Sequence, residues 1–288
     1  MKKIGFIGVG IMGKSMIRNL MKAGFEVAIY TRTKAKAEDV ISEGAIWRDT
    51  VKACVSDRDA VITIVGYPKD VEEVYFGQEG IIANAPAGAC LIDMTTSSPK
   101  LAVRIYEAAK ECGLGAIDAP VTGGDGGAKA GTLTILAGGD QEAFDACRPI
   151  FEAIGKNINY EGAAGNGQHT KMCNQIAVAG TLAGACEALA YAKGAGLDPQ
   201  TMLDSISTGA AGSAQMNNAI PRILKDDLSP GFFIKHFIKD MKLAREGAGD
   251  AAVNLGVLDY VLSMYETLEA EGYGDLGTQA LIRYYQHA

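Results

Sequence analysis

The sequence lacks the features that mark several classes of protein. Its six cysteines include no C-x-x-C pair, so neither a disulfide framework nor a zinc site is indicated. It has no basic excess, because its net charge is -7, which argues against a nucleic-acid surface. It has no apolar run of the roughly eighteen residues that a membrane helix needs, and no internal repeat, low-complexity tract or flexible linker. We therefore expect reduced thiols, no bound metal, and neither a nucleic-acid nor a membrane partner.

The composition is that of an ordinary globular protein. Hydrophobic residues make up 48% of the chain and charged residues 21%. At about 150 residues per domain, 288 residues suggest two domains. The start, Met1-Lys2-Lys3, resembles a signal peptide, but glycines interrupt the apolar residues at once and no small-residue cleavage site follows. We expect a cytoplasmic protein.

The segment GFIGVGIMGKSMIRNLMKAGFEVAIYTRTK, residues 5 to 34, carries the first functional motif. Residues 3–9 are typical of a buried strand, residues 15–23 have helical spacing, and residues 26–31 are typical of a second strand. This βαβ context gives meaning to the G-x-G-x-x-G pattern between the first strand and the helix. One glycine makes the tight turn, the second admits a pyrophosphate, and the third lets the helix pack closely. The pattern predicts dinucleotide binding at Gly8, Gly10, Ile11, Met12 and Gly13.

The end of the second strand bears on the choice of cofactor. NAD sites usually carry an acidic residue here, which accepts a hydrogen bond from the ribose 2′-hydroxyl. This chain has Thr31, Arg32 and Thr33 instead, and a guanidinium with two hydroxyls suits a 2′-phosphate. The alternative is that Arg32 is only an exposed surface charge. We predict NADP rather than NAD.

Further strands are predicted at residues 59–65 and 90–94, with a helix at 99–111 after the second of them. Ligands bind outside the carboxyl ends of parallel strands, so the loops that follow these two strands should line the crevice. The candidate cofactor-binding residues in these loops are Val65, Gly66 and Thr96.

A glycine-rich segment, PVTGGDGGAKAG, lies between two more predicted strands at residues 115–119 and 132–138. Strands this hydrophobic favour a fixed loop over a flexible hairpin. We predict a loop whose backbone amides are exposed to an anion.

After residue 162 the pattern becomes helical. A long, alanine-rich helix is predicted from about Gln168 to Lys193, ended by Gly194 and Gly196, and few strand-like runs follow. We therefore predict an α/β domain over residues 1–163 and an all-α domain over residues 164–288.

Four motifs together resemble those of the β-hydroxyacid dehydrogenase family, which includes 3-hydroxyisobutyrate dehydrogenases and tartronate semialdehyde reductases. They are GFIGVGIMG near the start, DAPVTGG at 118–124, GAAGNGQHTKMCNQ at 162–175 and KDMKLA at 239–244. The resemblance spans nearly the whole chain. It implies an N-terminal Rossmann domain, an all-α C-terminal domain joined by a long helix, an active site between them, a homodimer or homotetramer, and reversible oxidation of short 3-hydroxy carboxylates.

The resemblance also implies roles for particular residues. Lys171 matches the catalytic acid/base, and Lys239 matches a lysine at the nicotinamide side of the cofactor. The substrate carboxylate is expected at Thr122, Gly123 and Gly124, where a hydroxyl and two backbone amides hold an anion without charge. The family more often has serine at the position of Thr122.

The residues after the lysine depart from the family pattern, which has asparagine four positions later. This chain has Asn174 three positions after Lys171 and Gln175 four positions after it, so both lie on its helix face and both are candidate substrate contacts. His169 and His236 flank the motifs, and a structural role is favoured for each.

Two rival functions fit part of the sequence. An imine reductase of the same fold usually lacks the catalytic lysine, and a non-catalytic NADP-binding sensor or scaffold would leave the motifs at 118–124 and 162–175 unexplained. Glyoxylate, succinic semialdehyde and related aldehyde acids differ by small groups, so the sequence leaves the substrate open.

Overall fold

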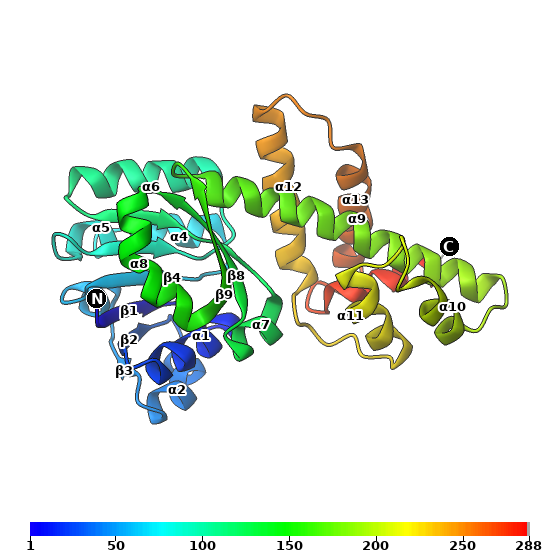
Figure 1. Ribbon diagram of the computed structural model, residues 1–288, viewed down its shortest axis with the longest axis horizontal. Helices are drawn as coiled ribbons and strands as arrows, with labels where there is room; N and C mark the ends of the chain where they lie inside the picture. The colour runs from blue at the N-terminus through cyan, green and yellow to red at the C-terminus, as the bar shows by residue number, and fades with distance from the viewer. Residues whose placement is uncertain (287–288) are drawn as a thin grey trace. The chain divides into compact units, whose positions relative to one another are not determined.

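The computed structural model describes residues 1–286, which form two compact units (Figure 1). The first unit comprises Met1–Lys171 and the second begins at Met172. The division falls inside the long helix α9 (Asn166–Gly194), which therefore belongs to both units.

The first unit is built on a sheet of nine strands within the described residues. Six parallel strands have the order β3-β2-β1-β4-β5-β6: β1 (Lys3–Ile7), β2 (Glu26–Tyr30), β3 (Ile46–Trp47), β4 (Ala60–Thr63), β5 (Cys90–Asp93) and β6 (Gly115–Asp118). Beyond β6, β8 (Leu133–Gly139) runs antiparallel and pairs with both β7 (Val121–Thr122) and β9 (Gly155–Gly162). The predicted Rossmann arrangement is confirmed.

Both faces of the central strands β1, β4, β5 and β6 are covered, which explains why these strands are largely apolar. Successive side chains point to opposite faces: Ile62 and Ile92 pack in one core cluster, whereas Val61 and Leu91 pack in the other. The first face is covered by α1 (Ile11–Lys22), η1 (Lys34–Ala37), α2 (Glu38–Ser42), α7 (Gly124–Ala130) and α8 (Gln141–Ile154). The second is covered by α3 (Val51–Val55), α4 (Pro68–Phe76), α5 (Ile81–Asn84) and α6 (Pro99–Glu111).

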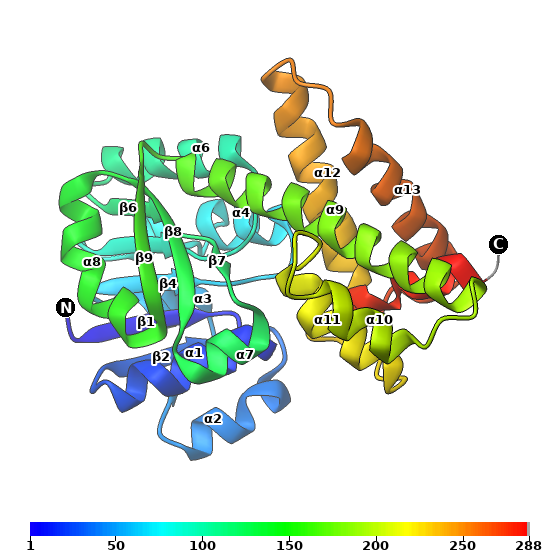
Figure 2. The same ribbon diagram turned by 45° about the vertical axis from the view of Figure 1, so that its right-hand side comes forward.

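The prediction of a loop between the strands at 115–119 and 132–138 is wrong. These residues contain the short strand β7 and the helix α7, which lies beside α1 (Figure 2). Ala128 of α7 is buried, and its carbonyl accepts a hydrogen bond from the Asn19 side chain of α1 at 2.7 Å. Packing against α1 therefore holds a helix in a segment whose glycines disfavour one locally.

Up to residue 286, the second unit is all-helical apart from one isolated bridge between Phe233 and Gly277, in agreement with the prediction of an all-α domain. It contains the rest of α9, then α10 (Pro199–Ile206), α11 (Ala214–Leu224), α12 (Ile234–Asp250), α13 (Gly256–Ala270) and η2 (Thr278–Gln286). Asp198 and Ser213 cap α10 and α11 by accepting backbone N–H hydrogen bonds.

Of the helices in residues 1–286, only α9 is long and apolar enough to cross a membrane by length and composition, with a mean hydropathy of 1.2 in its most apolar window. Its Leu182, Cys186 and Leu189 are fully buried in the core of the second unit. Core helices of globular proteins meet the same criterion.

The start of α9 is packed closely against the sheet of the first unit. A Cβ atom on Gly167 would lie 2.3 Å from the carbonyl oxygen of Leu136 and 2.6 Å from that of Asp118. Both are backbone atoms of strands, so neither can move aside cheaply. Only glycine lets the helix begin at this distance from β6 and β8.

Two glycine-to-alanine substitutions in α9 should therefore have opposite effects. Gly167→Ala should lower the free energy of unfolding by roughly 1 to 3 kcal/mol, as overpacking does. Gly184→Ala is the matched control: a Cβ there meets nothing within 4 Å, and alanine should stabilise the helix by about 0.5 to 1 kcal/mol. Urea unfolding would measure both. Equal effects would show that the helix start is not closely packed.

Candidate active site

The loop after β1 is shaped by its glycines. Gly8 has φ of 109°, and a Cβ on it would lie 2.0 Å from the Ile64 carbonyl oxygen. A Cβ on Gly13 would lie 2.0 Å from the Gly8 carbonyl oxygen, so α1 packs closely on this turn. A Cβ on Gly10, by contrast, meets no protein atom within 4 Å. Packing therefore requires glycine at the first and third positions, and the space beside the second is open.

This loop fits the pyrophosphate of a dinucleotide. Gly10 is the N-cap residue of α1, no side chain caps the helix, and the first turn contains no acidic residue. The first backbone N–H groups of a helix have no intrahelical partner and favour an anion. Gly10 and Ile11 are exposed and Met12 is partly exposed, so the predicted residues lie together at a surface.

The predicted 2′-phosphate residues follow β2. Arg32 is exposed, with 76% of its side chain accessible, and Thr31 and Thr33 lie beside it in sequence. An acidic residue does lie close by: Asp70 Oδ1 is 3.1 Å from Arg32 Nη1, and its other oxygen accepts the Tyr67 N–H at the start of α4. Asp70 therefore holds the guanidinium near the end of β2.

Side chains join the carboxyl ends of β4 and β5. The buried Asp93 accepts hydrogen bonds from the Thr63 hydroxyl at 2.8 Å and from the Thr95 backbone N–H at 3.1 Å. The Thr95 hydroxyl accepts in turn from the Val65 N–H at 3.0 Å. The predicted cofactor residues Val65, Gly66 and Thr96 therefore lie on two loops that are fixed to each other.

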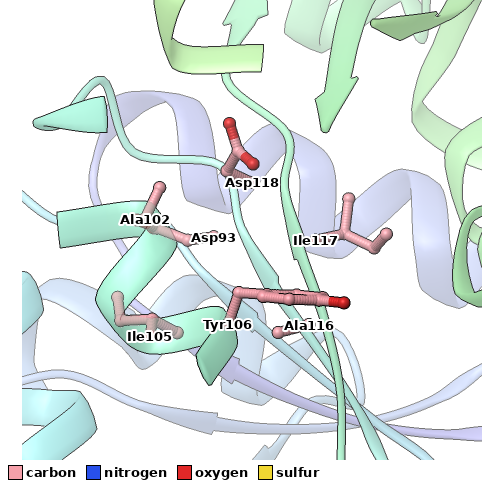
Figure 3. Close-up of a pocket in the computed structure, with 7 residues that line it drawn as sticks. All are labelled: Asp93, Ala102, Ile105, Tyr106, Ala116, Ile117 and Asp118. Atoms are coloured by element: carbon pink, nitrogen blue, oxygen red, sulfur yellow. The ribbon is translucent and has the colours of Figure 1, made fainter. Parts of the chain in front are cut away.

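Asp118, at the carboxyl end of β6, holds the start of α9. Its two carboxylate oxygens accept from the backbone N–H groups of Gly165 at 2.7 Å and Gln168 at 2.8 Å. A cavity of about 10 Å³, roughly the size of one water molecule, lies between this aspartate, β5, β6 and Tyr106 of α6 (Figure 3). The carboxyl group is 5% exposed, so its hydrogen bonds are made away from bulk solvent.

Burial raises the pKa of Asp118 to about 7, because a charged carboxylate is poorly solvated inside the protein. The N–H donors of Gly165 and Gln168 oppose this effect, and the negative charge of Asp93 adds to it. The proton affinity of this group is therefore linked to the position of the helix start.

Lys171 lies one turn along α9 from Gln168, and it is only 6% exposed. Its ammonium donates a hydrogen bond to the carbonyl oxygen of Val121 at 2.9 Å. Thr122 follows in the chain and is partly exposed, while Gly123 and Gly124 are exposed at the start of α7. The first unit thus brings the predicted acid/base next to the residues predicted to hold a carboxylate.

The next predicted residues lie in the second unit and contact one another. The Asn174 side chain donates to Gln175 Oε1 at 2.7 Å, and Gln175 Nε2 donates to Asp240 Oδ2 at 2.6 Å. The other oxygen of Asp240 lies 2.9 Å from the ammonium of Lys239. Both ends of the Gln175 amide are thus engaged within the protein, whereas Asn174 is partly exposed.

Two histidines flank the motifs, and neither is part of a cluster of metal ligands within residues 1–286. His169 is exposed, and His236 packs edge-on against Phe233 with ring centroids 5.7 Å apart. Burial, together with the charges of Lys239 and Lys235, lowers the pKa of His236 below its ordinary value. Within residues 1–286, no group of three or more His, Cys, Asp or Glu side chains is arranged to hold a metal ion.

Comparison with known proteins agrees with this geometry over nearly the whole chain. Residues 3–162 match the family described as the NAD binding domain of 6-phosphogluconate dehydrogenase, and residues 165–285 match that described as NAD-binding of NADP-dependent 3-hydroxyisobutyrate dehydrogenase. The chain belongs to the β-hydroxyacid dehydrogenase family. It is an NAD(P)-dependent oxidoreductase.

Individual relatives of this dehydrogenase cover it almost completely. An uncharacterised oxidoreductase of Bacillus subtilis (strain 168), YkwC, is 55% identical over 98% of both chains. The 2-hydroxy-3-oxopropionate reductase of Escherichia coli (strain K12) is 36% identical over 98% of this chain and 96% of its own. The structure of Psf3 in complex with NADP⁺ and 2-OPP has a TM-score of 0.90 at 26% identity, over 99% of both chains.

Four residues that organise this dehydrogenase were not predicted from the sequence. Asp118 and Gln168 stand inside the motifs at 118–124 and 162–175, so the motifs themselves offered a signal. Asp70 and Asp240 reach Arg32 and Gln175 from 38 and 65 positions away in the chain. No local pattern marks a contact of that separation.

The raised pKa of Asp118 should make the stability of this dehydrogenase depend on pH. Because folding favours the protonated carboxyl, its contribution to stability is greatest in acid and is lost as the pH rises toward 7. Relative to the non-titrating variant Asp118→Asn, the wild type should lose roughly 2 to 3 kcal/mol between about pH 5 and pH 8. Urea unfolding of both proteins at the two pH values tests this. A constant difference would show that Asp118 stays ionised throughout.

Proposed function

We propose that this dehydrogenase uses NADP to interconvert a short 3-hydroxy carboxylate and its semialdehyde. The observation that carries the proposal is the placement of Lys171. Its ammonium is buried and held by the Val121 carbonyl, one residue before the Thr122 to Gly124 turn. An acid/base group thus stands beside an anion-binding turn on a domain that binds a dinucleotide.

Lys171 has the chemistry that the reaction needs. When bound, the nicotinamide cofactor supplies a hydride in reduction and takes one up in oxidation. As the aldehyde carbon is reduced, negative charge grows on its oxygen, and Lys171 donates a proton to that oxygen. In oxidation Lys171 removes the proton from the hydroxyl. An ammonium has three N–H donors, and the Val121 carbonyl orients it by accepting one of them.

The turn after β7 orients the substrate. The Thr122 hydroxyl and the backbone amides of Gly123 and Gly124 donate hydrogen bonds to the carboxylate. Fixing the carboxylate beside Lys171 sets the distance from this group to the reacting carbon, and so selects hydroxy acids by their chain length. Gln175 acts through Asp240 and Asn174 rather than on the substrate, since its amide is bonded at both ends and the residue is only 4% exposed.

Three observations support NADP as the cofactor. Arg32 presents an exposed guanidinium after β2, and Asp70 holds it in place. Residues 165–285 match a family described as NADP-dependent, and the similar protein Psf3 was solved with NADP⁺. A bidentate guanidinium and two hydroxyls suit a phosphate better than a bare ribose.

Candidate substrates are 3-hydroxyisobutyrate and 2-hydroxy-3-oxopropionate, also called tartronate semialdehyde, and the similarity to a reductase of the latter supports this class. Glyoxylate and succinic semialdehyde test the required chain length. Initial rates for this panel with NADPH and NADH, and for the hydroxy acids with the oxidised cofactors, would test the proposal. NADPH binding without turnover of any aldehyde acid would instead favour a non-catalytic sensor.

Arg32→Asp should reverse the cofactor preference. The variant removes a cation and adds a carboxylate that accepts from a ribose hydroxyl, so NADPH should bind at least about tenfold more weakly while NADH binding is unchanged or improved. Lys36→Asp, with the same charge change on exposed η1, is the control for general electrostatics. Fluorescence titration measures both cofactors. An equal loss with NADPH and NADH would refute the role of Arg32.

Lys171→Ala should lower kcat by about 10²- to 10⁴-fold, the effect of losing an acid/base, with little change in NADPH affinity. Lys171→Arg should also be poor, because a guanidinium does not give up its proton at accessible pH. Thr122→Ala should act mainly on KM, with a loss equivalent to roughly 1.5 to 3 kcal/mol. Steady-state kinetics at saturating substrate separates the two sites. If Lys171→Ala keeps near-normal kcat and only KM rises, Lys171 is a carboxylate anchor.

A further inference from the structure

Gln168 connects two parts of the site that come from distant points in the chain. Its side chain is fully buried, its Oε1 accepts the Ser97 backbone N–H at 2.9 Å, and its Nε2 donates to the Thr95 carbonyl at 2.8 Å. The two bonds bracket Thr96, the predicted cofactor contact on the loop after β5. A planar amide that makes both bonds fixes this loop in position and in orientation.

The backbone of Gln168 is itself fixed. Its N–H donates to Asp118 Oδ2 at 2.8 Å, and the neighbouring Gly167 leaves no room for the helix start to shift toward β6 and β8. The side-chain amide therefore extends from a backbone position that a hydrogen bond and close packing hold in place. The position of the Thr95 to Ser97 segment is set by α9, in addition to its own strand.

Gln168 also precedes Lys171 by three residues on α9. Residues three apart on a helix are neighbours on its surface, with Cβ atoms about 5 to 6 Å apart. One rigid helical turn therefore carries the group that holds the cofactor loop and the group assigned to proton transfer. A substitution at Gln168 therefore removes the link between the loop and this helical turn and leaves the Lys171 side chain itself unchanged.

We propose that Gln168 is a positioning residue that sets the distance between the cofactor loop at Thr95 to Ser97 and the ammonium of Lys171. The proposal rests on the function proposed above, in which hydride and proton transfer occur at one substrate carbonyl. Reacting groups must be held within a fraction of an ångström for efficient transfer, and a 1 Å misplacement can cost about 10²-fold. Gln168 acts on geometry and makes no contact with the reacting atoms.

The test compares Gln168→Met with Asn166→Ala. Methionine keeps the side-chain length and removes both hydrogen bonds to the loop. Asn166 lies at the same helix start, and its exposed side chain bonds only to the Glu161 carbonyl at 2.8 Å among the contacts described, so its loss controls for disturbance of the helix end. Gln168→Glu is the second variant, because it keeps the volume and an acceptor for Ser97 N–H but loses the donor to the Thr95 carbonyl.

The first readout is independent of activity. Amide hydrogen exchange of the free protein should be faster in a peptide covering residues 95–98 in Gln168→Met, because the Ser97 N–H loses its acceptor. The same peptide should exchange as in wild type in Asn166→Ala. Wild-type exchange in Gln168→Met would overturn the proposed clamp.

The second readout follows hydride transfer. In Gln168→Met, kcat should fall at least about tenfold, KM for the aldehyde acid and Kd for NADPH should change less than about threefold, and the isotope effect with deuterated NADPH should rise. Gln168→Glu should show the same direction of change. A purely structural role would reduce the amount of folded enzyme and leave the isotope effect unaltered.

The outcomes separate this proposal from the proposed function. A wild type that turns over no aldehyde acid refutes the function. If the wild type is active and either folded Gln168 variant keeps a normal kcat and isotope effect, only the positioning role is refuted. Loss of folding in both variants would assign Gln168 to stability alone and would also overturn the proposal.

Discussion

The buried carboxylate of Asp118 is the constraint on which the rest of the site depends. Burying a carboxylate is costly unless its oxygens are hydrogen-bonded, and here each oxygen accepts a backbone N–H from the start of α9. The strand β6 and the long helix are joined at this point, although their residues are some fifty positions apart in the chain. Lys171 then lies one turn further on, at a place the carboxylate has fixed.

Buried polar groups also join neighbouring elements at the carboxyl ends of other parallel strands. Asp93 joins the ends of β4 and β5, and Gln168 joins the loop after β5 to α9. Each of these polar groups is buried and satisfied by a partner on a different element, so displacement of one element would leave donors or acceptors unpaired in another. The loop predicted to contact the cofactor is thereby tied to the strands beneath it.

The fold alone does not decide what this dehydrogenase reduces, since sites rather than folds carry specificity. The side chains predicted to contact the substrate, those of Thr122, Asn174 and Gln175, are therefore the ones whose surroundings bear on specificity. Gln175 donates a hydrogen bond to Asp240, which also pairs with the ammonium of Lys239. Gln175 is therefore engaged inside the second unit, whereas Asn174 is partly exposed.

The sequence by itself determined five of the six parallel strands, the glycine turn and the long helix, but not the short strand β3. The spacing of apolar residues, the length of apolar runs and the placement of glycines are local properties of the sequence. The parallel strands predicted from them agree with those observed to within two residues at each end. The tertiary structure alone decided that residues 124–130 form a helix against α1 and that the exposed, polar segment β9 joins the sheet. It also decided three long-range contacts: Asp70 with Arg32, Asp118 with the start of α9, and Asp240 with Gln175. These outcomes depend on contacts between residues far apart in the chain, whose energies no local pattern records, because they arise from burial and hydrogen bonding after the chain has folded.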